Sequence, residues 1–341
     1  MSITLDILEK EAFLIVIVSI MIAVNILKHN NVLDPVYYFL QSHIRNKKIL
    51  LCILSTMYGI LPIPGRIMVA VSMLDTCTDG SKDRSGLGIV AYLSTHHYYL
   101  WSPLEKSVLI VLASTGMTYI QFINSMSAYI CITLILTYGY ILFAVKSIDN
   151  IVVTFQKPEV GDSRKAMISI LLLGVTILLC CIDKSAILYI FPIYTLYLYI
   201  KYNPKNILQK IDWLLVFWIG VIIAISTILH TYTDQIKIYA ENLATMYGIH
   251  VALIVSFFAA VLLGSSSRFA AVTVIMTSIF GLIYMPLFYI VDYCGYLLSP
   301  SHKCVSIGNM YFKTKLIIFY KTIGLLSLVL MSTAIVHYFI L

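Results

Sequence analysis

The sequence predicts an all-α protein that crosses a membrane several times. Of its 341 residues, 60% are hydrophobic and only 11% are charged, whereas about a quarter of the residues in a soluble domain carry a charge. Several apolar stretches approach the ~20 residues that a helix needs to cross the hydrocarbon core of a bilayer. The alternation of apolar and polar residues that marks an outer-membrane barrel is missing. Because no polar stretch is long enough for a soluble catalytic domain, we expect a membrane protein that is not an enzyme.

Unbroken apolar stretches predict simple membrane helices. The first, residues 12–27, follows an N-terminus that lacks the basic region and the cleavage site of a signal peptide. We therefore expect it to remain as a membrane helix. The later stretches cover residues 122–145, 167–182, 185–200, 213–229 and 323–341.

Two other apolar stretches are interrupted and predict broken helices. The prolines of Leu61-Pro62-Ile63-Pro64-Gly65 interrupt residues 49–74, and Ser102-Pro103 interrupts residues 86–117. Prolines and a glycine cannot continue a helix without the loss of backbone hydrogen bonds. Non-helical backbone is tolerated at membrane depth only where protein buries it or where it lines a cavity. We expect pairs of half-helices that meet inside the membrane.

The second half of the chain repeats this arrangement. A turn of small residues precedes Arg268, as the proline turn precedes Arg66. The segment YLWSPLEKSVLI, which begins at Tyr99, is matched by YLLSPSHKCVSI from Tyr296, with seven of twelve positions identical. We interpret the single membrane domain, residues 1–341, as a first repeat core, linking helices and a second repeat: residues 49–145, 146–210 and 211–341.

The distribution of basic residues predicts that the two repeats are inverted. The lysine- and arginine-rich loops 28–48, 146–165 and 201–210 belong in the cytoplasm by the positive-inside rule, which places the N-terminus outside. Loop 230–242, with one lysine, then falls outside, and the lysines of residues 313–321 return to the cytoplasm. Inverted repeats with paired broken helices are typical of secondary transporters. Which broken element is the re-entrant hairpin stays open.

The residues around the breaks predict an anion site. Four half-helices are expected to start after the breaks, each with a cation in its first turn: Arg66, Lys106, Arg268 and Lys303. A helix N-terminus presents free N–H groups and partial positive charge, which these cations reinforce. Arginine also suits bidentate binding of carboxylate or phosphate. The other expected binding residues are Pro64, Gly65, Ser102, Pro103, Gly264, Ser265, Ser266, Ser267, Ser299 and Pro300.

The same charged residues have a second interpretation. Lysine and arginine near helix ends often extend to lipid headgroups, and breaks close to the membrane surface would make all four cations interfacial anchors. Glu105 and its repeat counterpart His302 are candidates for proton coupling, or else partners of the neighbouring lysines. The excess of 23 lysines and arginines over 16 acidic residues is first a topology signal and does not indicate a nucleic-acid partner.

Other kinds of site lack support in the sequence. His96, His97, Asp292, Cys294 and His302 show no metal-ligand spacing, such as two histidines four residues apart on a helix, so we expect no metal. A Walker loop and a nucleophile elbow are also missing, which argues against ATP-driven transport and membrane hydrolysis. The seven cysteines have no paired spacing and predict no disulfide framework.

Several short motifs resemble a family of uncharacterised archaeal and bacterial integral membrane proteins. Residues 61–65 resemble its Leu-Pro-x-Pro-Gly-Gly turn, and Leu298-Ser-Pro-Ser-His-Lys-Cys304, shortly before Tyr311-Phe312, resembles its Ser-Pro-x-His-x-Cys segment. His97 and Trp101-Ser-Pro-Leu104 resemble its Arg-His-x-Trp-Glu segment before Pro-Leu. The resemblance covers roughly residues 50–315 and implies an ion-transporter superfamily carrier, related to gluconate, citrate, dicarboxylate and arsenite permeases. The corresponding positions are Pro62, Pro64, Gly65, His97, Pro103, Ser299, Pro300, His302 and Cys304.

The sequence departs from this family at positions that bear on ion coupling. Arg66 stands where the second glycine is expected, and no acidic residue follows His97 before Pro103. The Ser-Asn-Thr sodium signature of the superfamily's dicarboxylate carriers is absent as well. His97 therefore joins Glu105 and His302 as a coupling candidate, and the choice between Na⁺ and H⁺ stays open.

Two functions remain after this reading. The first is a multi-pass permease of the plasma membrane that moves a small anion by an elevator or rocking motion, as a homodimer if the resemblance holds. The second is a structural or assembly subunit of a larger membrane complex that keeps a carrier-like fold without transport. A carrier predicts a polar, water-reachable space between the two Ser-Pro breaks, whereas a subunit predicts that side chains fill it.

Overall fold

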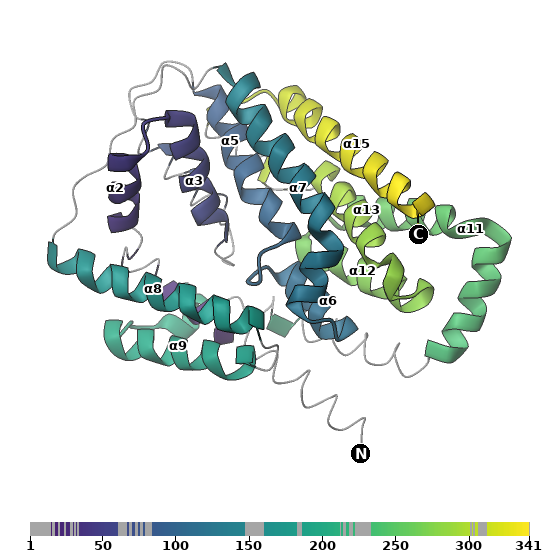
Figure 1. Cartoon of the computed structure of the whole chain (residues 1–341), viewed down its shortest axis with the longest axis horizontal. Helices are drawn as coiled ribbons and strands as arrows, with labels where there is room; N and C mark the ends of the chain where they lie inside the picture. The colour runs from purple at the N-terminus through teal and green to yellow at the C-terminus, as the bar shows by residue number, and fades with distance from the viewer. Residues whose placement is uncertain are drawn as a thin grey trace. The chain divides into compact units, whose positions relative to one another are not determined.

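The structure is a computed structural model of the chain (Figure 1). It describes residues 34–60, 84–146, 160–182, 186–211, 233–300 and 312–340, with scattered residues in 15–32, 67–78, 213–221 and 302–305. The described residues form helices joined by turns, and no strand occurs among them. The prediction of an all-α protein is confirmed for this part of the chain.

The contacts between residues divide the chain into two compact units. Unit 1 comprises Met1–Tyr98, Tyr138–Phe217 and Ile307–Thr314. Unit 2 comprises Tyr99–Thr137, Trp218–Ser306 and Lys315–Leu341. Both Ser-Pro breaks therefore lie in the same unit, although almost 200 residues separate them in the sequence.

Unit 1 is built from pairs of packed helices. Its described helices are α2 (Asp34–His43), α3 (Lys47–Ile60), α5 (Ser85–His96), α8 (Val160–Ile182) and α9 (Ala186–Tyr202). Helix α3 packs against α5, and α8 packs against α9. Near the end of α9 the ammonium group of Lys201 donates to the carbonyl of Lys165 at 3.0 Å and to the hydroxyl of Ser169 at 2.9 Å. These bonds hold the C-terminal end of α9 against the start of α8.

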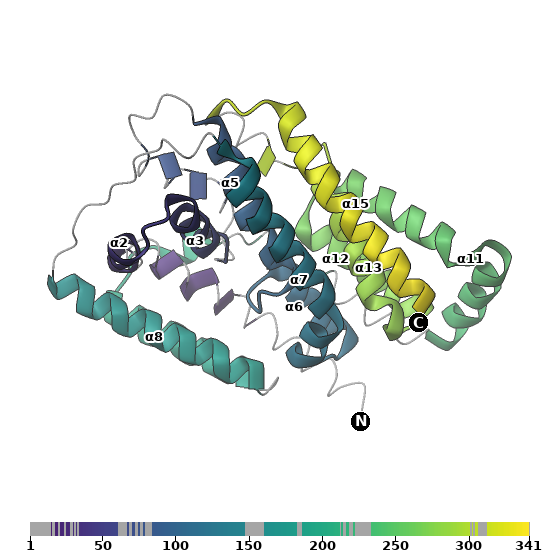
Figure 2. The same cartoon turned by 45° about the horizontal axis from the view of Figure 1, so that its top comes forward.

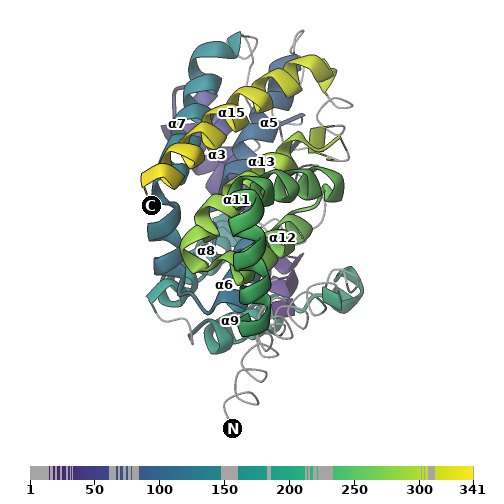
Figure 3. The ribbon, with the colours of Figure 1, turned by 90° about the vertical axis from the view of Figure 1, so that its right-hand side faces the viewer.

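Unit 2 surrounds a buried central helix, α13. Its other elements are α6 (Lys106–Thr115), α11 (Thr233–Leu263), α12 (Ser266–Phe280), η4 (Leu282–Tyr284), α15 (Leu316–Ile340) and the first part of α7 (Tyr119–Ala144). Helices α11, α12 and α15 all pack against α13 (Met285–Leu298), and α6 packs against α12 (Figures 2 and 3). Every residue of α13 up to Leu297 is buried. This helix is therefore the core of the unit.

The predicted interruptions are observed wherever the structure describes the chain. Helix α5 and the short η1 (His97–Leu100) end before Ser102-Pro103, and α6 starts at Lys106. Helix α11 ends at Leu263 and α12 begins at Ser266, so the small-residue turn is shorter than predicted. Helix α13 stops at Leu298, directly before the second Ser-Pro pair. The proline turn at residues 61–66 lies outside the described residues.

One sharp bend was not predicted from the sequence. Gly248 divides α11 with φ 70° and ψ 159°, a backbone conformation that residues with a side chain rarely adopt. Figure 1 shows the sharp bend of α11. In the sequence, the only sign of this bend is the single glycine within an apolar stretch.

Among the described residues, two helices are long and apolar enough to cross a membrane, α7 with 26 residues and α15 with 25. They overlap the predicted spans 122–145 and 323–341. Helices α8 and α9 overlap the predicted spans 167–182 and 185–200 in extent alone. Large apolar side chains on them face outward; Phe143 of α7 is 82% exposed. The described residues of the predicted span 12–27 are helical, whereas most of the predicted span 213–229 lies outside the described residues.

Candidate functional site

The first Ser-Pro break forms a turn that is organised by its own serine. The hydroxyl of Ser102 accepts from the backbone N–H of Leu104 at 3.3 Å, and the carbonyl of Ser102 accepts from the N–H of Glu105 at 3.1 Å. The phenol of Tyr119, from α7, donates to the carbonyl of Trp101. Glu105 then has the extended backbone of an N-cap residue, and α6 follows with Lys106 as its first residue. The predicted position of a cation in the first turn is confirmed here.

The second Ser-Pro break is attached to another helix. The hydroxyl of Ser299 donates to the carbonyl of Val261, near the end of α11, at 2.6 Å. The carbonyl of Ser299 accepts from the N–H of His302 at 3.1 Å, and the imidazole of His302 stacks on Tyr296 with ring centroids 4.3 Å apart. Pro300 is exposed, and Lys303 lies outside the described residues.

Equivalent tyrosines of the two breaks meet each other. Tyr99 and Tyr296 stand 197 positions apart, which is the offset of the sequence repeat, and their hydroxyl oxygens are 3.0 Å apart. The phenol of Tyr289, from α13, donates to the carbonyl of Tyr99 at 2.6 Å, and its oxygen is 2.9 Å from the hydroxyl oxygen of Ser107. The start of α6 is thereby joined to the central helix. We call Tyr99, Tyr289, Tyr296 and the neighbouring Phe269 the tyrosine junction.

The tyrosine junction is closed. Phe269 packs against Tyr289 and Tyr296 with ring centroids 5.5 and 5.3 Å apart. None of the four side chains is more than 4% exposed. Buried aromatic rings therefore fill the place where the segments just before the two Ser-Pro breaks meet, whereas the carrier hypothesis predicts a polar space between the breaks.

The small-residue turn lies beside the second break, because Val261 precedes Gly264 by one helical turn. Gly264 has φ 55°, and Ser265 is the extended N-cap of α12. Ser266 and Ser267 already belong to the helix, and the side chain of Ser267 lies outside the described residues. Arg268 is in the first turn of α12, as predicted, with an exposed side chain.

Among the described residues of unit 2, the N-termini of α6 and α12 combine a helix start with a cation in the first turn. The side chain of neither N-cap residue, Glu105 or Ser265, bonds to the first turn of its own helix. Helix N-termini attract anions through their free N–H groups and the macrodipole. Lys106 and Arg268 add positive charge at these same positions. Free N–H groups beside a cation are the kind of arrangement that binds a carboxylate or another oxyanion.

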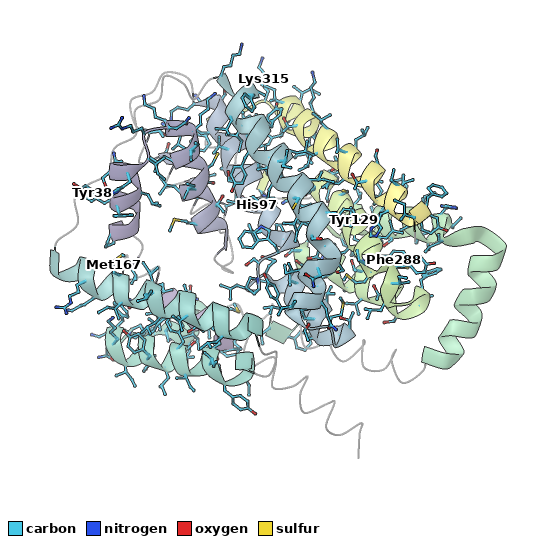
Figure 4. All side chains as sticks on the ribbon, viewed as in Figure 1. Tyr38, His97, Tyr129, Met167, Phe288 and Lys315 are labelled. Atoms are coloured by element: carbon cyan, nitrogen blue, oxygen red, sulfur yellow. The ribbon has the colours of Figure 1, made fainter. Side chains whose placement is uncertain are left out.

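The remaining predicted site residues belong to unit 1 or to undescribed segments. Pro64, Gly65 and Arg66 fall in the proline turn, outside the described residues. His97 is buried at the end of α5 (Figure 4), where its Nε2 is 3.1 Å from the hydroxyl of Tyr138 and 3.4 Å from that of Thr56. This cluster is a polar network inside unit 1.

Glu105 and His302, the other two coupling candidates, are both buried in unit 2. Glu105 is 1% exposed and His302 is 2% exposed. They follow Ser102 and Ser299, respectively, at the same spacing of three residues. Both candidates are thus buried side chains that directly follow the Ser-Pro breaks in the sequence.

Asp292 is a buried carboxyl that sequence reasoning named only within a rejected metal site. It lies in α13 with 0% exposure. The hydroxyl of Ser256, from α11, donates to its Oδ1, and the hydroxyl of Thr273, from α12, donates to its Oδ2 at 2.7 Å. One signal could have drawn attention to it: Asp292 is the only acidic residue after Glu241.

Comparison with known proteins gives no family assignment. A scan against known protein families finds no match, and no curated protein matches the chain. The resemblance to the uncharacterised membrane family therefore stays a prediction that rests on its short motifs.

Proposed function

We propose that the protein is a secondary transporter of a small anion, a carboxylate or another oxyanion, that works by alternating access. The proposed site lies between the two Ser-Pro breaks, beside the N-termini of α6 and α12. The observation that carries this proposal is the hydrogen bond between Tyr99 and Tyr296, the equivalent tyrosines of the two breaks. Broken helices that converge in pairs are the feature on which such carriers build their substrate sites.

The closed junction fits a carrier between its two open states. Alternating access requires a stage in which neither side of the membrane reaches the site. The hydroxyls of Tyr99 and Tyr296 are joined by one hydrogen bond, and such bonds within membranes contribute only about 0.6 kcal/mol on average. Substrate binding must therefore supply little to break this bond, and must also part the ring contacts of Phe269 with Tyr289 and Tyr296.

The proposal includes the membrane topology that the sequence predicts. The protein is a multi-pass protein of the plasma membrane with an external N-terminus and inverted repeats, and it works as a homodimer within the ion-transporter superfamily. The apolar outward faces of α7 and α15 support placement in a bilayer, because exposed apolar surface of this length is unfavourable in water. The charge distribution supports the orientation.

A second candidate is a structural subunit of a larger membrane complex. The observation that favours it is the filling of the junction by four aromatic side chains, none more than 4% exposed. In this role the breaks are held together for stability, and the apolar outward faces contact partner chains in addition to lipid.

Proteoliposome uptake separates the two candidates. Labelled gluconate, citrate, succinate and phosphate are offered to vesicles that contain the purified protein, and exchange with internal unlabelled anion is measured. For the transported anion we expect Arg268→Glu to reduce exchange at least about tenfold, which corresponds to a loss of ~1.4 kcal/mol, because a carboxylate replaces a cation in the first turn of α12.

The matched control is Lys315→Glu, which reverses an exposed charge outside the site (Figure 4). Exchange that is equal in Arg268→Glu and wild type contradicts the proposed site. The subunit role is supported instead by two results together. Vesicles without the protein exchange every anion as fast as vesicles that contain it, and the protein is isolated from cells together with other membrane chains.

A further inference from the structure

Asp292 marks a second polar site in unit 2, away from the helix N-termini. Three helices contribute to it: α13 supplies the carboxyl, α11 the hydroxyl of Ser256 and α12 the hydroxyl of Thr273. All three side chains are 0% exposed. A carboxyl at this depth is expensive unless it is neutral or paired, so it is a functional candidate.

No positive charge neutralises Asp292 among the residues that the structure describes. Helices α11, α12 and α15 and η4 pack against α13, and Tyr99, Ser107 of α6, Phe122 of α7 and His302 also contact it. The described titratable groups of these elements in unit 2, with those of α13 itself, are Tyr99, Glu105, Lys106, Tyr119, Tyr129, Cys131, His250, Arg268, Tyr284, Tyr320, Lys321, His337, Tyr338, Tyr289, Tyr293, Cys294, Tyr296 and His302. None of these makes an ion pair or a hydrogen bond with the carboxyl in the described part of the chain. Arg268, Lys321 and His250 are exposed instead.

The spacing of the oxygen atoms suits a proton better than a metal ion. An ion such as Ca²⁺ binds about six to eight oxygen ligands, more than the carboxyl and the two hydroxyls supply. The hydroxyl oxygen of Thr273 is 2.7 Å from Oδ2 of Asp292, which is the distance of a direct O–H···O hydrogen bond. The two groups are thus bonded to each other directly.

Thr273 also allows the carboxyl to accept a proton without leaving a buried group unsatisfied. Its hydroxyl oxygen is 3.3 Å from the carbonyl oxygen of Phe269, one turn earlier in α12. When Asp292 is ionised, the threonine donates its proton to Oδ2. When a proton binds to Oδ2, the new O–H donates to Thr273, and the threonine hydroxyl rotates to donate to Phe269. The bound proton comes from water, and no other bond changes.

We propose that Asp292 binds a proton reversibly and couples anion transport to a proton gradient, an inference that rests on the proposed function. Helix α12 links the two sites. Arg268 lies in the first turn of α12, directly before Phe269 of the tyrosine junction. Thr273 lies one helical turn after Phe269 on the same helix. Because Asp292 is fully buried, it exchanges its proton only when these helices move, which is the condition that coupling requires.

Proton binding is tested first, without transport. Infrared spectra of the purified protein are compared between acidic and alkaline buffer. We expect a carbonyl band of a protonated carboxyl that appears on acidification and is missing from Asp292→Asn. Thr273→Val keeps the carboxyl but removes one hydrogen-bond partner, so the band should persist at a shifted position. Thr333→Val is the matched control, since its hydroxyl bonds only to the carbonyl of Val329 in α15.

Two outcomes of this first test overturn the assignment. One is a titrating band that is the same in wild type and Asp292→Asn. The other applies if Asp292→Asn fails to fold: a band that Thr273→Val leaves unmoved does not come from Asp292. Either result shows that Asp292 does not bind the proton.

Coupling is tested in proteoliposomes with the anion that wild type exchanges. At zero membrane potential, a gradient of one pH unit that drives one coupled proton accumulates the anion about tenfold. We expect that accumulation in wild type and Thr333→Val, and none in Asp292→Asn. Accumulation in Asp292→Asn equal to wild type overturns the coupling role, as does accumulation driven by a Na⁺ gradient and not by a pH gradient.

The two proposals fail in distinguishable ways. If wild-type vesicles exchange none of the offered anions, the proposed function fails and the coupling role falls with it, while the infrared titration still decides whether Asp292 binds a proton. If wild-type vesicles exchange an anion, but a pH gradient accumulates it equally in wild type and Asp292→Asn, only the coupling role fails.

Discussion

At the first Ser-Pro break the serine hydroxyl bonds to its own turn, whereas at the second it bonds to a neighbouring helix. Ser102 accepts from the N–H of Leu104, two residues later in the chain. Ser299 donates to the carbonyl of Val261, which lies in α11. The same dipeptide thus closes a local turn in one place and joins two helices in the other. Repetition in sequence therefore predicts where breaks occur, but not how each one is held.

The two breaks also differ in how they reach the central helix. The second break is the end of α13 itself, so its position depends on how closely α13 packs against α11. The first break is connected to α13 by the phenol of Tyr289, which bonds to the carbonyl of Tyr99 and the hydroxyl of Ser107. The second connection depends on close packing together with the bond from Ser299 to Val261, and the first on the hydrogen bonds of Tyr289. The following predictions test this difference, beginning with the largest effect.

The largest expected effect is at Gly295, where α13 touches α11. A Cβ atom added there would lie 2.5 Å from the carbonyl oxygen of Phe257 and 3.0 Å from the Cβ of Ala260. Because the nearest atom is backbone, the helices must move apart, and such overpacking costs about 1–3 kcal/mol. We expect Gly295→Ala to lower the midpoint of unfolding in mixed detergent micelles.

Gly324→Ala is the control for that change, because a Cβ atom on Gly324 of α15 meets no atom within 4 Å. It should leave the midpoint unchanged or raise it. Equal midpoints for the two variants would mean that α11 and α13 are not closely packed at the second break.

The next effect is expected at Tyr289, which holds the first break. Tyr289→Phe keeps the ring but removes the donor to the buried carbonyl of Tyr99. An unsatisfied buried group costs about 1–3 kcal/mol, and we expect the low end, since hydrogen bonds in membranes are weak. Unfolding in mixed micelles measures the loss, with the 67% exposed Tyr189 as a Tyr→Phe control. A Tyr289→Phe variant as stable as the Tyr189→Phe control would show that these bonds do not hold the break.

The smallest effect compares the two serines directly. We expect Ser299→Ala to cost about 1 kcal/mol, because it leaves the carbonyl of Val261 in α11 without this donor, and Ser102→Ala to cost less, because it alters only a local turn. The same unfolding assay gives both values. A larger loss at Ser102 than at Ser299 would reverse the comparison.

The sequence alone determined the helical class and several helix ends in the described chain. Apolar composition and helix length are local properties, so the stretch 122–145 predicted α7 (Tyr119–Ala144) to within three residues at each end. Helices α8 and α15 begin seven residues before the predicted spans 167–182 and 323–341, and α2 and the start of α11 lie in the predicted loops 28–48 and 230–242, because polar and charged residues can continue a helix. Proline and glycine act on the backbone within one or two residues, so the breaks before Lys106 and after Leu298 were also predictable. The bend at Gly248 was not, since most glycines in apolar helices cause none.

Only the tertiary structure decided what the predicted residues do. Tyr99 and Tyr296 are equivalent positions of the sequence repeat. Their hydrogen bond, however, depends on how α13 packs among α11, α12 and α15. Asp292 was visible as a lone acid in an apolar segment, and only the fold brings Ser256 and Thr273 to it from helices 36 and 19 residues away in the chain. Composition and local breaks follow from neighbouring residues, whereas contacts between distant side chains follow from the faces on which helices pack.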